Sequence, residues 1–276
     1  TPRPTRQRRA TTRRAAAERP VATPADVAFA HRLADAAAAA VLPHFRRLDA
    51  IEIKADATPV TRADRAAEEA MRALLARERP ADGVLGEEFA PIEGEGGRLW
   101  VLDPIDGTKA FTAGKPTFTT LIALFEHGRP VLGVIEQPYN RERWVGHDGA
   151  AWFNGRPLAT RRGTTLARAV TSSTAPELFE SAADRAAFAR VEAAVGYLSW
   201  GGDAYAYGLL AMGCVDLIVE MQLKPFDLGP LAPIVEGAGG RITDWGGRPL
   251  DLESDGRILA AGDATLHEAA LARLAG

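Results

Sequence analysis

The sequence predicts an α/β fold, and three observations support this prediction. The second half of the chain alternates apolar, strand-like runs with helical stretches. The first half combines two long helical stretches with a series of short strands and a hairpin signal. At 276 residues, with 46% hydrophobic and 25% charged residues, the chain has the ordinary composition of a globular protein and can bury a large core, as one large domain or as two joined halves.

A strong helix start opens the first half, because Thr23-Pro24-Ala25-Asp26 supplies a Thr cap, a Pro in the first turn and an acid at the third position. We expect this helix to run to about Arg46, bent at Pro43. A second helix is expected from Arg62 to Arg79. Strands are expected at 51–54, 83–86, 98–103, 117–125, 130–136, 141–145 and 151–153, the last two flanking the turn signal His147-Asp148-Gly149. These elements predict helices packed on a largely antiparallel sheet.

The second half alternates strands and helices. The strands are expected at 168–172, 196–199, 215–220, 240–243 and 257–260, and the helices at 177–194, 203–213, 227–238 and 263–274. Such alternation implies a sheet covered on both faces. We place the junction of the halves near residues 160–165, which gives an N-terminal α+β half over 23–162 and a C-terminal α/β half over 163–276, after a basic tail over 1–22.

The segment from Asp103 to Thr108 is the clearest functional signal in the chain. The apolar run Leu99–Leu102 reads as a short buried strand, and Pro104 is expected to end it because proline cannot continue a hydrogen-bond ladder. Asp103 and Asp106 then lie at the carboxyl end of the strand, where open α/β sheets place their ligands. The Gly107-Thr108 step offers N–H groups and a hydroxyl to an anion at a helix start. Carboxylates for hard cations beside donors for phosphate indicate metal-assisted phosphoryl chemistry. A Pro-Asp-Gly turn is the structural alternative, but it does not explain an acid directly after four apolar residues.

Three further acids lie at the ends of predicted elements and are candidates to complete this site. Glu87 belongs to Gly86-Glu87-Glu88-Phe89, after a short apolar strand; Asp64 closes Thr61-Arg62-Ala63-Asp64 at a helix start; and Asp227 closes Lys224-Pro225-Phe226-Asp227 after the strand that ends at Glu220. Each has a structural alternative: a solvated loop acid for Glu87, the partner in a Thr61 capping box for Asp64, and a helix cap for Asp227. Their joint occurrence with the Asp103 segment favours a shared site.

Taken together, these motifs resemble the inositol monophosphatase superfamily of magnesium-dependent phosphatases. The matching segments are Val60–Asp64, Gly86–Glu88, Trp100–Thr108 and Pro225–Asp227, in the same order and with similar spacing, and the likeness runs from about residue 25 to the C-terminus. The resemblance implies a layered αβαβα sandwich of the inositol monophosphatase / fructose-1,6-bisphosphatase type. It also implies an active site between the two halves.

The resemblance implies two Mg²⁺ ions per active site, or three. Asp103 is expected to bridge the ions, with Glu87 and the Ile105 carbonyl in one site and Asp106 and Asp227 in the other. Glu87, Thr108 and Asp64 are the expected catalytic residues, Thr108 and Asp64 orienting or deprotonating the attacking water. The backbone N–H groups of Gly107 and Thr108 are expected to hold phosphate oxygens. Attack by water is expected to be in line, without a covalent intermediate.

Within the superfamily, the chain is most similar to the histidinol-phosphate phosphatase branch. Three stretches carry this likeness: Asp106–Pro116, Glu142–Gly146, and Trp200–Gly208 running on to Leu223–Asp227. At the helix start Gly202-Asp203-Ala204, inositol phosphatases show Gly-Thr-Ala, and a carboxylate suits a cationic substrate better than a polyol. Gly202, Asp203, Ala204 and Glu220 are the expected substrate residues, with an ordinary helix cap and a solvated strand end as structural alternatives. Tyr205, Tyr207 and Trp200 could line a pocket for an imidazole ring, although packing explains such residues more often.

Other functions stay open at this point. The protein could act on inositol 1-phosphate or on a 3′(2′),5′-bisphosphate nucleotide, the latter requiring basic groups such as Lys109 or Lys224 for the second phosphate. A more remote alternative is a non-catalytic binding protein. Residues 1–20 contain seven Arg and one Glu, so a nucleic-acid-binding arm is conceivable. We favour an irregular extension and expect no nucleic-acid partner, because this tail has almost no apolar residue except alanine.

The remaining expectations concern location and assembly. No apolar run approaches the ~18 residues of a membrane span, so no membrane partner is expected. The single cysteine, Cys214, is expected to be a small core residue in a cytoplasmic, reducing compartment. The family expectation is a homodimer that acts on a small-molecule phosphate monoester.

Overall fold

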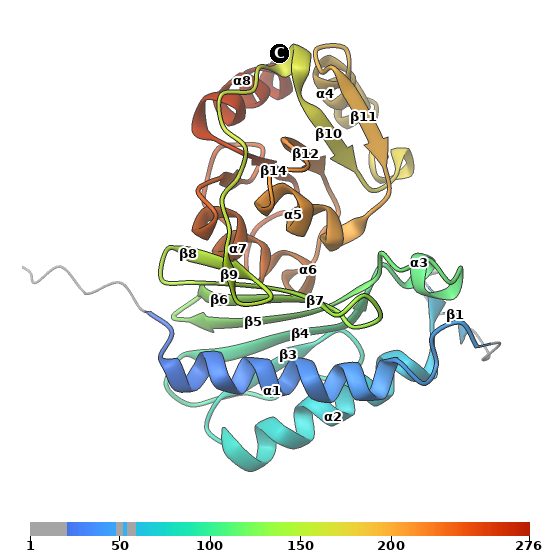
Figure 1. Ribbon diagram of the computed structural model, residues 1–276, viewed down its shortest axis with the longest axis vertical. Helices are drawn as coiled ribbons and strands as arrows, with labels where there is room; N and C mark the ends of the chain where they lie inside the picture. Colours follow the sequence, from blue (N-terminus) through green and yellow to red (C-terminus); the bar gives the residue numbers. More distant parts are fainter. Residues whose placement is uncertain (1–20, 48–51, 54–58) are drawn as a thin grey trace, which may run out of the picture.

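The computed structural model describes residues 21–47, 52–53 and 59–276; residues 1–20, most of the predicted basic tail, lie outside this range. Five layers are stacked on one another (Figure 1). They are helices α1 and α2, a seven-stranded sheet, helices α5, α6 and α7, a five-stranded sheet, and helices α4 and α8. The predicted αβαβα sandwich is confirmed.

The outer helices of the first half begin where their caps predict. Helix α1 (Pro24–Val41) starts after Thr23, whose hydroxyl accepts the Asp26 N–H while its own N–H binds the Asp26 carboxylate. Helix α2 (Arg62–Glu78) starts in the same way after Thr61. The prediction that α1 continues to Arg46 with a bend at Pro43 is wrong. The helix ends at Val41: Leu42 still donates its N–H to the Ala38 carbonyl, but Pro43 has no N–H to continue the ladder.

The first sheet is largely antiparallel, as predicted, with the order β3-β4-β5-β6-β7-β8-β9. Its strands are β3 (Gly83–Gly86), β4 (Arg98–Asp106), β5 (Thr119–Glu126), β6 (Arg129–Gln137), β7 (Glu142–His147), β8 (Ala150–Phe153) and β9 (Arg156–Pro157). Only β3 and β4 run parallel. Strand β9 was not predicted. The pair β1 (Glu52–Ile53) and β2 (Pro59–Val60) is separate, and the outer residues of the predicted strand 51–54 lie outside the described range.

Strand β4 does not stop at Pro104, contrary to the prediction. Its pairing with β5 shifts register between Asp103 and Asp106 and resumes at Asp106 with Thr119. Because β3 pairs with β4 only as far as Leu102, no neighbouring strand on that side needs an N–H from Pro104. The Pro104 carbonyl instead accepts the Thr120 hydroxyl at 2.7 Å. The irregularity leaves two acids on one short stretch of strand.

The middle layer consists of α5 (Asp203–Ala211), α6 (Pro225–Leu228) and α7 (Leu231–Gly237). The single helix predicted over 227–238 is therefore two helices. The break falls at Gly229 and Pro230, since Pro230 has no N–H with which to continue the helix. Apolar side chains from this layer fill the space between the two sheets, among them Tyr207, Leu210, Leu231 and Ile234.

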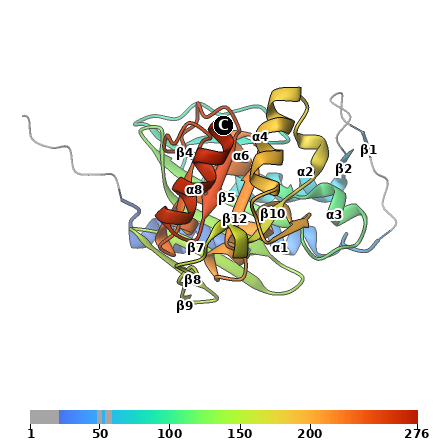
Figure 2. The same cartoon turned by 90° about the horizontal axis from the view of Figure 1, so that it is seen from above.

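The second sheet has the order β11-β10-β12-β14-β13 and is covered on both faces, as predicted. Its strands are β10 (Val170–Ser173), β11 (Tyr197–Trp200), β12 (Leu217–Glu220), β13 (Arg241–Thr243) and β14 (Ile258–Ala261). Helices α4 (Ala182–Glu192) and α8 (Ala264–Ala275) pack side by side on the outer face (Figure 2), where Arg190 Nε donates to the Arg273 carbonyl at 2.8 Å. The helix predicted over 177–194 starts only at Ala182, after its Ser181 cap.

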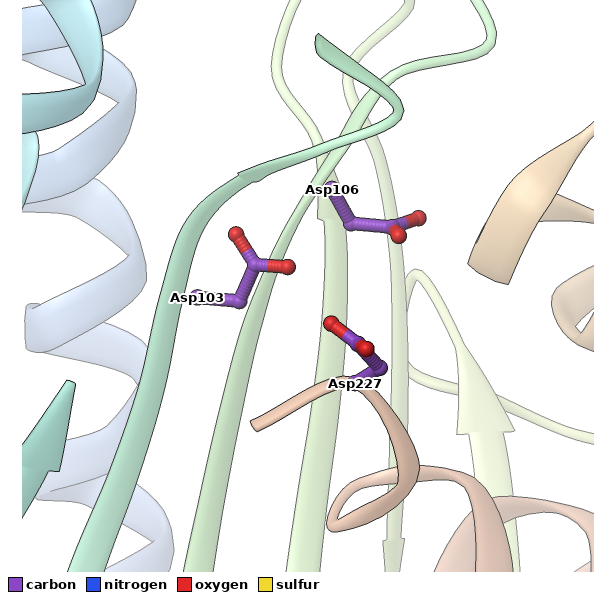
Figure 3. A group of neighbouring side chains, drawn as sticks. All are labelled: Asp103, Asp106 and Asp227. Carbon is purple, nitrogen blue, oxygen red and sulfur yellow. The ribbon is translucent and has the colours of Figure 1, made fainter. Parts of the chain in front are cut away.

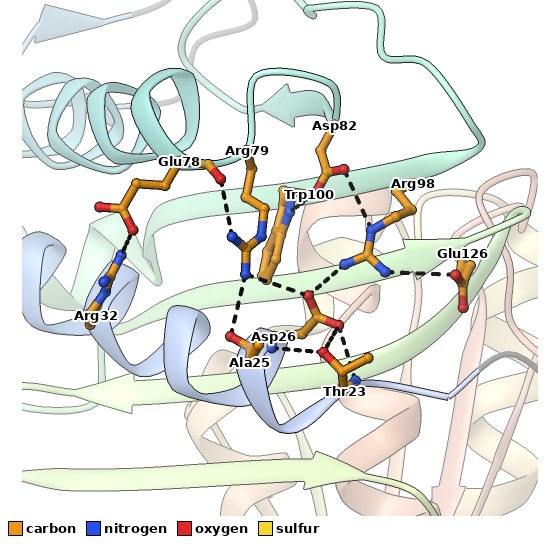
Figure 4. Close-up of polar contacts among 10 residues, drawn as sticks. All are labelled: Thr23, Ala25, Asp26, Arg32, Glu78, Arg79, Asp82, Arg98, Trp100 and Glu126. Carbon is orange, nitrogen blue, oxygen red and sulfur yellow. Dashed lines mark hydrogen bonds and ion pairs between the residues drawn. The ribbon is translucent and has the colours of Figure 1, made fainter.

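The far end of β4 from the acids is held by a charged network (Figure 4). Arg98, the first residue of β4, binds the Asp26 carboxylate at 2.6 Å and lies 3.5 Å from that of Asp82. Asp82 also accepts the indole N–H of the fully buried Trp100 at 2.8 Å. The network ties the start of α1 to the sheet, so it anchors β4 from the end opposite to the site.

Two further properties concern the surface of the described residues. Cys214 is exposed, so its prediction as a core residue is wrong: it follows the last turn of α5, where the chain passes over the surface toward β12. None of the helices within residues 21–47 and 59–276 combines the length and the apolar character needed to cross a bilayer.

Candidate active site

Three predicted metal ligands converge on one point of the molecule. Asp103, Asp106 and Asp227 each present a carboxylate oxygen, and these three oxygens lie within 4.8 Å of one another (Figure 3). Asp103 and Asp106 come from the end of β4, and Asp227 comes from α6, more than a hundred residues along the chain. The predicted convergence of distant acids on a shared site is therefore seen in the structure.

Local hydrogen bonds set the direction of each of these acids. The Ile105 N–H donates to Asp103 Oδ1 at 2.9 Å across the irregular step of β4. Asp106 Oδ2 accepts the Ala204 N–H at 2.7 Å and the Thr119 hydroxyl at 3.3 Å. Asp227 Oδ2 accepts the Lys224 N–H at 2.7 Å, at the first turn of α6. Each carboxylate is thus oriented by backbone donors before any ligand is present.

The electrostatics of the cluster are those of a cation site. Burial raises the pKa of Asp103 well above its usual range, and the charges of Glu87, Asp106 and Asp227 raise it further. Burial also raises the pKa of Asp106, and it raises that of Asp227 to about 7. Like charges buried this close oppose each other's ionisation. Clustered carboxylate oxygens are what Mg²⁺ and other hard divalent cations prefer, so these residues fit such an ion.

Glu87 and Asp64 border the cluster without belonging to its closest group. Glu87 follows β3, and its N–H donates to the Leu102 carbonyl at 3.2 Å, next to Asp103. Its charge raises the pKa of Asp103, Asp227 and Asp64. Asp64 is buried and accepts both the N–H and the hydroxyl of Thr61, at 2.8 and 2.6 Å. The capping-box interpretation of Asp64 is therefore correct, and the same residue also lies beside the acids.

Gly107 and Thr108 form the start of α3 (Thr108–Thr112), as predicted. The Thr108 hydroxyl donates to the Ile105 carbonyl at 3.1 Å, so the hydroxyl predicted to be catalytic and the carbonyl predicted to be a metal ligand contact each other. Gly107 adopts a φ of 75° and lies close to the Asp203 side chain, since a Cβ built on Gly107 would be 3.0 Å from Asp203 Oδ2. The predicted phosphate-binding step and the predicted substrate residue are thus neighbours.

The segment Gly202-Asp203-Ala204 begins α5 and faces the cluster. Ala204 donates its N–H to Asp106, and Asp203 follows the positive-φ Gly202 with a φ of 44° of its own. Burial raises the pKa of Asp203, and the charges of Lys109 and Lys115 lower it in part. The side chain of Asp203 lines a small cavity beside the acid cluster, and the cap position of α5 is occupied by Gly202.

Glu220 lines a small cavity of about 150 Å³ beside the acid cluster. Its carboxylate accepts the hydroxyls of Thr174 and of Tyr207, the latter at 2.9 Å. Burial raises the pKa of Glu220 to about 7. The cavity is lined by Asp106, Thr174, Leu178, Asp203, Ala204, Tyr207, Glu220, Met221, Gln222, Leu223, Asp227 and Leu231.

The sequence motifs did not indicate Thr174, although its position directly after β10 is a signal of the same kind as the acids at other strand ends. Of the three aromatic residues proposed for an imidazole pocket, only Tyr207 lines the cavity. The Tyr205 hydroxyl donates to Glu142 at 2.8 Å, and Trp200 packs against Phe188 near the surface. Packing therefore explains two of the three.

Comparison with known proteins agrees with this architecture. The model of the inositol monophosphatase family matches residues 25–275. A histidinol-phosphatase of Streptomyces coelicolor is 38% identical over 263 residues, which cover 90% of this chain and 96% of that protein. The bifunctional phosphatase IMPL2, chloroplastic, of Arabidopsis thaliana is 43% identical over 257 residues, 90% of this chain and 74% of that protein.

A solved structure of an inositol monophosphatase from Zymomonas mobilis superimposes with a TM-score of 0.83 at 49% sequence identity, covering 91% of this chain and 98% of that one. The residues matched by the family model, 25–275, span both halves of the sandwich and the candidate site. The chain therefore belongs to the inositol monophosphatase family and is a phosphatase.

Proposed function

We propose that the protein is a Mg²⁺-dependent histidinol-phosphate phosphatase, which hydrolyses L-histidinol phosphate to L-histidinol and phosphate. The observation that carries the substrate assignment is the position of Asp203. Its carboxylate lies against Gly107, at the predicted phosphate-binding step, and faces the same cavity as Glu220. Two acids beside the predicted phosphate site, the half-buried Asp203 and the buried Glu220, suit a substrate that carries an ammonium group and a titratable imidazole.

The acid cluster would hold the metal ions. Asp103, Asp106, Asp227, Glu87 and the Ile105 carbonyl supply the oxygen ligands for two Mg²⁺, with Glu87 also available to a third. When bound, the ions supply an activated water and neutralise charge on the leaving oxygen. Metal dependence is typical of this family, and the cluster of oxygens in the described residues agrees with it.

The chain's own residues then position the reactants. Burial raises the pKa of the Asp64 carboxylate, which makes it a better proton acceptor for the attacking water. The Thr108 hydroxyl lies next to the Ile105 carbonyl and orients the same water. The N–H groups of Gly107 and Thr108 hold phosphate oxygens at the start of α3. Asp203 and Glu220 hold the cationic part of the substrate in the cavity.

The relatives support this proposal and also supply a second candidate. Proteins named histidinol-phosphatase match the chain at 34% to 38% identity. Inositol 1-phosphate is the second candidate substrate, because the inositol monophosphatase of Zymomonas mobilis is 49% identical. A nucleotide bisphosphate ranks below both, since the two lysines considered for its second phosphate already interact with acids of the site, Lys109 with Asp203 and Lys224 with Asp227.

The direct experiment compares phosphate release, with Mg²⁺, from histidinol phosphate, inositol 1-phosphate and 3′-phosphoadenosine 5′-phosphate. We expect the highest kcat/KM for histidinol phosphate. Asp203→Asn is expected to raise KM for histidinol phosphate about tenfold or more, the equivalent of ~1.4 kcal/mol, and to change KM for inositol 1-phosphate little. Asp251→Asn, an exposed acid outside the cavity, is the matched control. Equal losses on both esters would remove the substrate argument.

We also propose a homodimer and a cytoplasmic location. The edge strand β11 exposes Tyr197 and Trp200, at 62% and 42% of their surface, and such a strand edge suits a contact with a second copy. Light scattering of the purified protein would test the dimer, and cell fractionation would test the location. The absence of a nucleic-acid partner stays a prediction.

A further inference from the structure

A fully buried acid outside the predicted site supports the loop that carries Glu87. Glu68 lies on α2 with none of its surface exposed. Its Oε2 accepts the Glu88 N–H at 2.7 Å, and its Oε1 accepts Nε of Arg72 at 2.7 Å. Arg72 in turn donates from Nη2 to the Phe89 carbonyl at 3.1 Å. The Glu68 carboxylate and the Arg72 guanidinium thus hydrogen-bond to the backbone of the two residues that directly follow Glu87.

The close contact between Glu68 and the loop depends on Gly86. A Cβ at Gly86 would lie 1.9 Å from Glu68 Oε1, far inside contact distance. The backbone of Gly86 is not in the left-handed region, so a turn does not require glycine here. The glycine of the Gly-Glu-Glu motif is explained instead by the carboxylate beneath it.

Helix α2 links this support to the acids. Asp64 and Glu68 are four positions apart and therefore share one face of the helix. After burial, the charge of Glu87 is a further cause of the raised pKa of Asp64, and the Glu68 carboxylate accepts the N–H of Glu88, the residue after Glu87. On the other side, the Glu87 N–H is bound to β4 next to Asp103. The loop is held from both sides, by β4 before Glu87 and by α2 after it.

Burying Glu68 has a cost that packing alone does not explain. A carboxylate without access to water is unfavourable unless it is paired and hydrogen-bonded, and an apolar residue of similar size is often as good for stability. Both oxygens of Glu68 are engaged, one by a cation and one by the loop backbone. This arrangement restrains the direction of the loop, which an apolar side chain cannot do.

We propose that Glu68 is a positioning residue that sets the affinity of the site for divalent metal by holding Glu87 in place. The proposal rests on the proposed function in one respect, the assignment of Glu87 as a metal ligand. Partners of metal ligands commonly contribute a factor of about 10 to 100 to metal affinity. Glu68→Gln is the sharpest variant: its side-chain amide keeps the shape but offers one acceptor oxygen to two donors, so either the Glu88 N–H or Arg72 loses its partner.

The test measures Mn²⁺ binding by isothermal titration calorimetry, without substrate, on the full chain. Glu68→Gln is expected to weaken Mn²⁺ binding about 10-fold or more. Its neighbour Glu69 is exposed on the same helix, so Glu69→Gln removes the same charge and is expected to bind as the unchanged protein does. Hydrogen exchange of the peptide spanning 86–89 is expected to accelerate only in Glu68→Gln.

A double-mutant cycle separates the two assignments. If Glu68 acts through Glu87, then Glu68→Gln/Glu87→Gln binds Mn²⁺ no more weakly than Glu87→Gln alone. Fully additive losses, or unchanged binding by Glu68→Gln, would overturn the role of Glu68 while leaving Glu87 as a ligand. Unchanged binding by Glu87→Gln would instead overturn the ligand assignment in the proposed function, and this proposal with it.

A second variant covers the case in which Glu68→Gln does not fold. Arg72→Lys keeps a cation beside Glu68 but loses the planar fork that reaches Glu68 and the Phe89 carbonyl together. We expect a smaller loss of Mn²⁺ affinity, about 3- to 10-fold, and faster exchange at 86–89. A folded Arg72→Lys protein with unchanged affinity and unchanged exchange would contradict the proposal.

Discussion

Replacing Asp227 by Asn is expected to have opposite effects on stability in the absence and in the presence of Mg²⁺. Asp227 lies beside Asp103 and Asp106 and is half-buried, and this loss of solvation raises its pKa to about 7. The substitution keeps an oxygen that can accept the Lys224 N–H, so α6 retains its first turn. What changes is the charge, which opposes folding without a cation and binds the cation when one is present.

The size of the effect follows from the pKa of Asp227. In the unfolded chain this carboxyl has the ordinary pKa of about 3.8, so the folded value of about 7 differs by roughly three pH units. Between these values the folded state keeps the proton and the unfolded state has lost it, so the free energy of unfolding falls as pH rises. Above pH 7 the loss is complete and amounts to at most about 4 kcal/mol. An Asn at this position lacks this penalty at every pH.

The assay is urea unfolding followed by circular dichroism at pH 5.5 and 8.5, in EDTA and in Mg²⁺. In EDTA at pH 8.5 we expect Asp227→Asn to be more stable than the unchanged protein by about 2–4 kcal/mol, and this advantage to shrink toward pH 5.5. In Mg²⁺ at about 1,000 times its Kd the order is expected to reverse, because the bound ion then stabilises the unchanged protein by about 4 kcal/mol.

Two results would refute this reasoning. One is an Asp227→Asn protein that is less stable than the unchanged protein in EDTA at pH 8.5, since the acid would then be stabilising without a cation. The other is a stability difference that does not depend on Mg²⁺, since the cluster would then have no role in binding the ion.

Three further predictions concern other parts of the chain. Glu220→Gln is expected to become more stable relative to the unchanged protein as pH rises from 5 to 8, by up to about 3 kcal/mol, because burial raises the pKa of Glu220 to about 7 and ionisation of this acid therefore opposes folding. Urea unfolding in EDTA measures the difference in free energy of unfolding between the two proteins, and a difference that does not change with pH would contradict the prediction. Arg98→Ala is expected to lower the free energy of unfolding by about 2–3 kcal/mol, because it leaves the buried Asp26 without its closest cation, whereas the control Arg77→Ala, at an exposed arginine, costs little. Both variants are expected to keep their phosphatase activity at a temperature where both are folded. A loss of activity in Arg98→Ala alone would contradict the view that this network only stabilises the fold. Gly133→Ala is expected to lower the free energy of unfolding by about 1–3 kcal/mol and to weaken Mn²⁺ binding, because its methyl group would collide with the Pro230 carbonyl. Calorimetry measures both, and unchanged stability with unchanged Mn²⁺ affinity would contradict a close contact between the first sheet and the middle helices at this position.

Local sequence signals predicted the starts of α1 and α2, because the chemistry of a cap lies within four residues. The boxes at Thr23 and Thr61 both form as expected. The consequences of proline were harder to predict, since they depend on neighbours that the local sequence does not show. Pro43 coincides with the end of a helix, whereas Pro104 lies within a strand because its missing N–H faces no partner strand.

In the candidate site, too, features set by the local sequence were predicted and features set by distant segments were not. The acids at strand and helix ends were recognisable from their position after apolar runs, and three of them bring carboxylate oxygens within 4.8 Å of one another. The residues that support them were not recognisable, because their role arises from contacts between distant segments. Glu68 reads as one more charge on a helix, and Thr174 reads as one more hydroxyl in a loop, until the fold brings them to Glu88 and Glu220.

The close stacking of the layers explains why a site can form at all between β4 and α6. Asp227 reaches Asp103 only if the middle layer lies almost directly on the first sheet. Two glycines of that sheet allow this contact: a Cβ at Gly133 would lie 2.2 Å from the Pro230 carbonyl oxygen, and one at Gly146 would lie 2.3 Å from that of Pro233. Both contacts fall on the segment that follows Asp227, so a methyl group at either glycine would push this segment away from β4. The spacing of the metal ligands is therefore a property of the packing between layers as much as of the acids themselves.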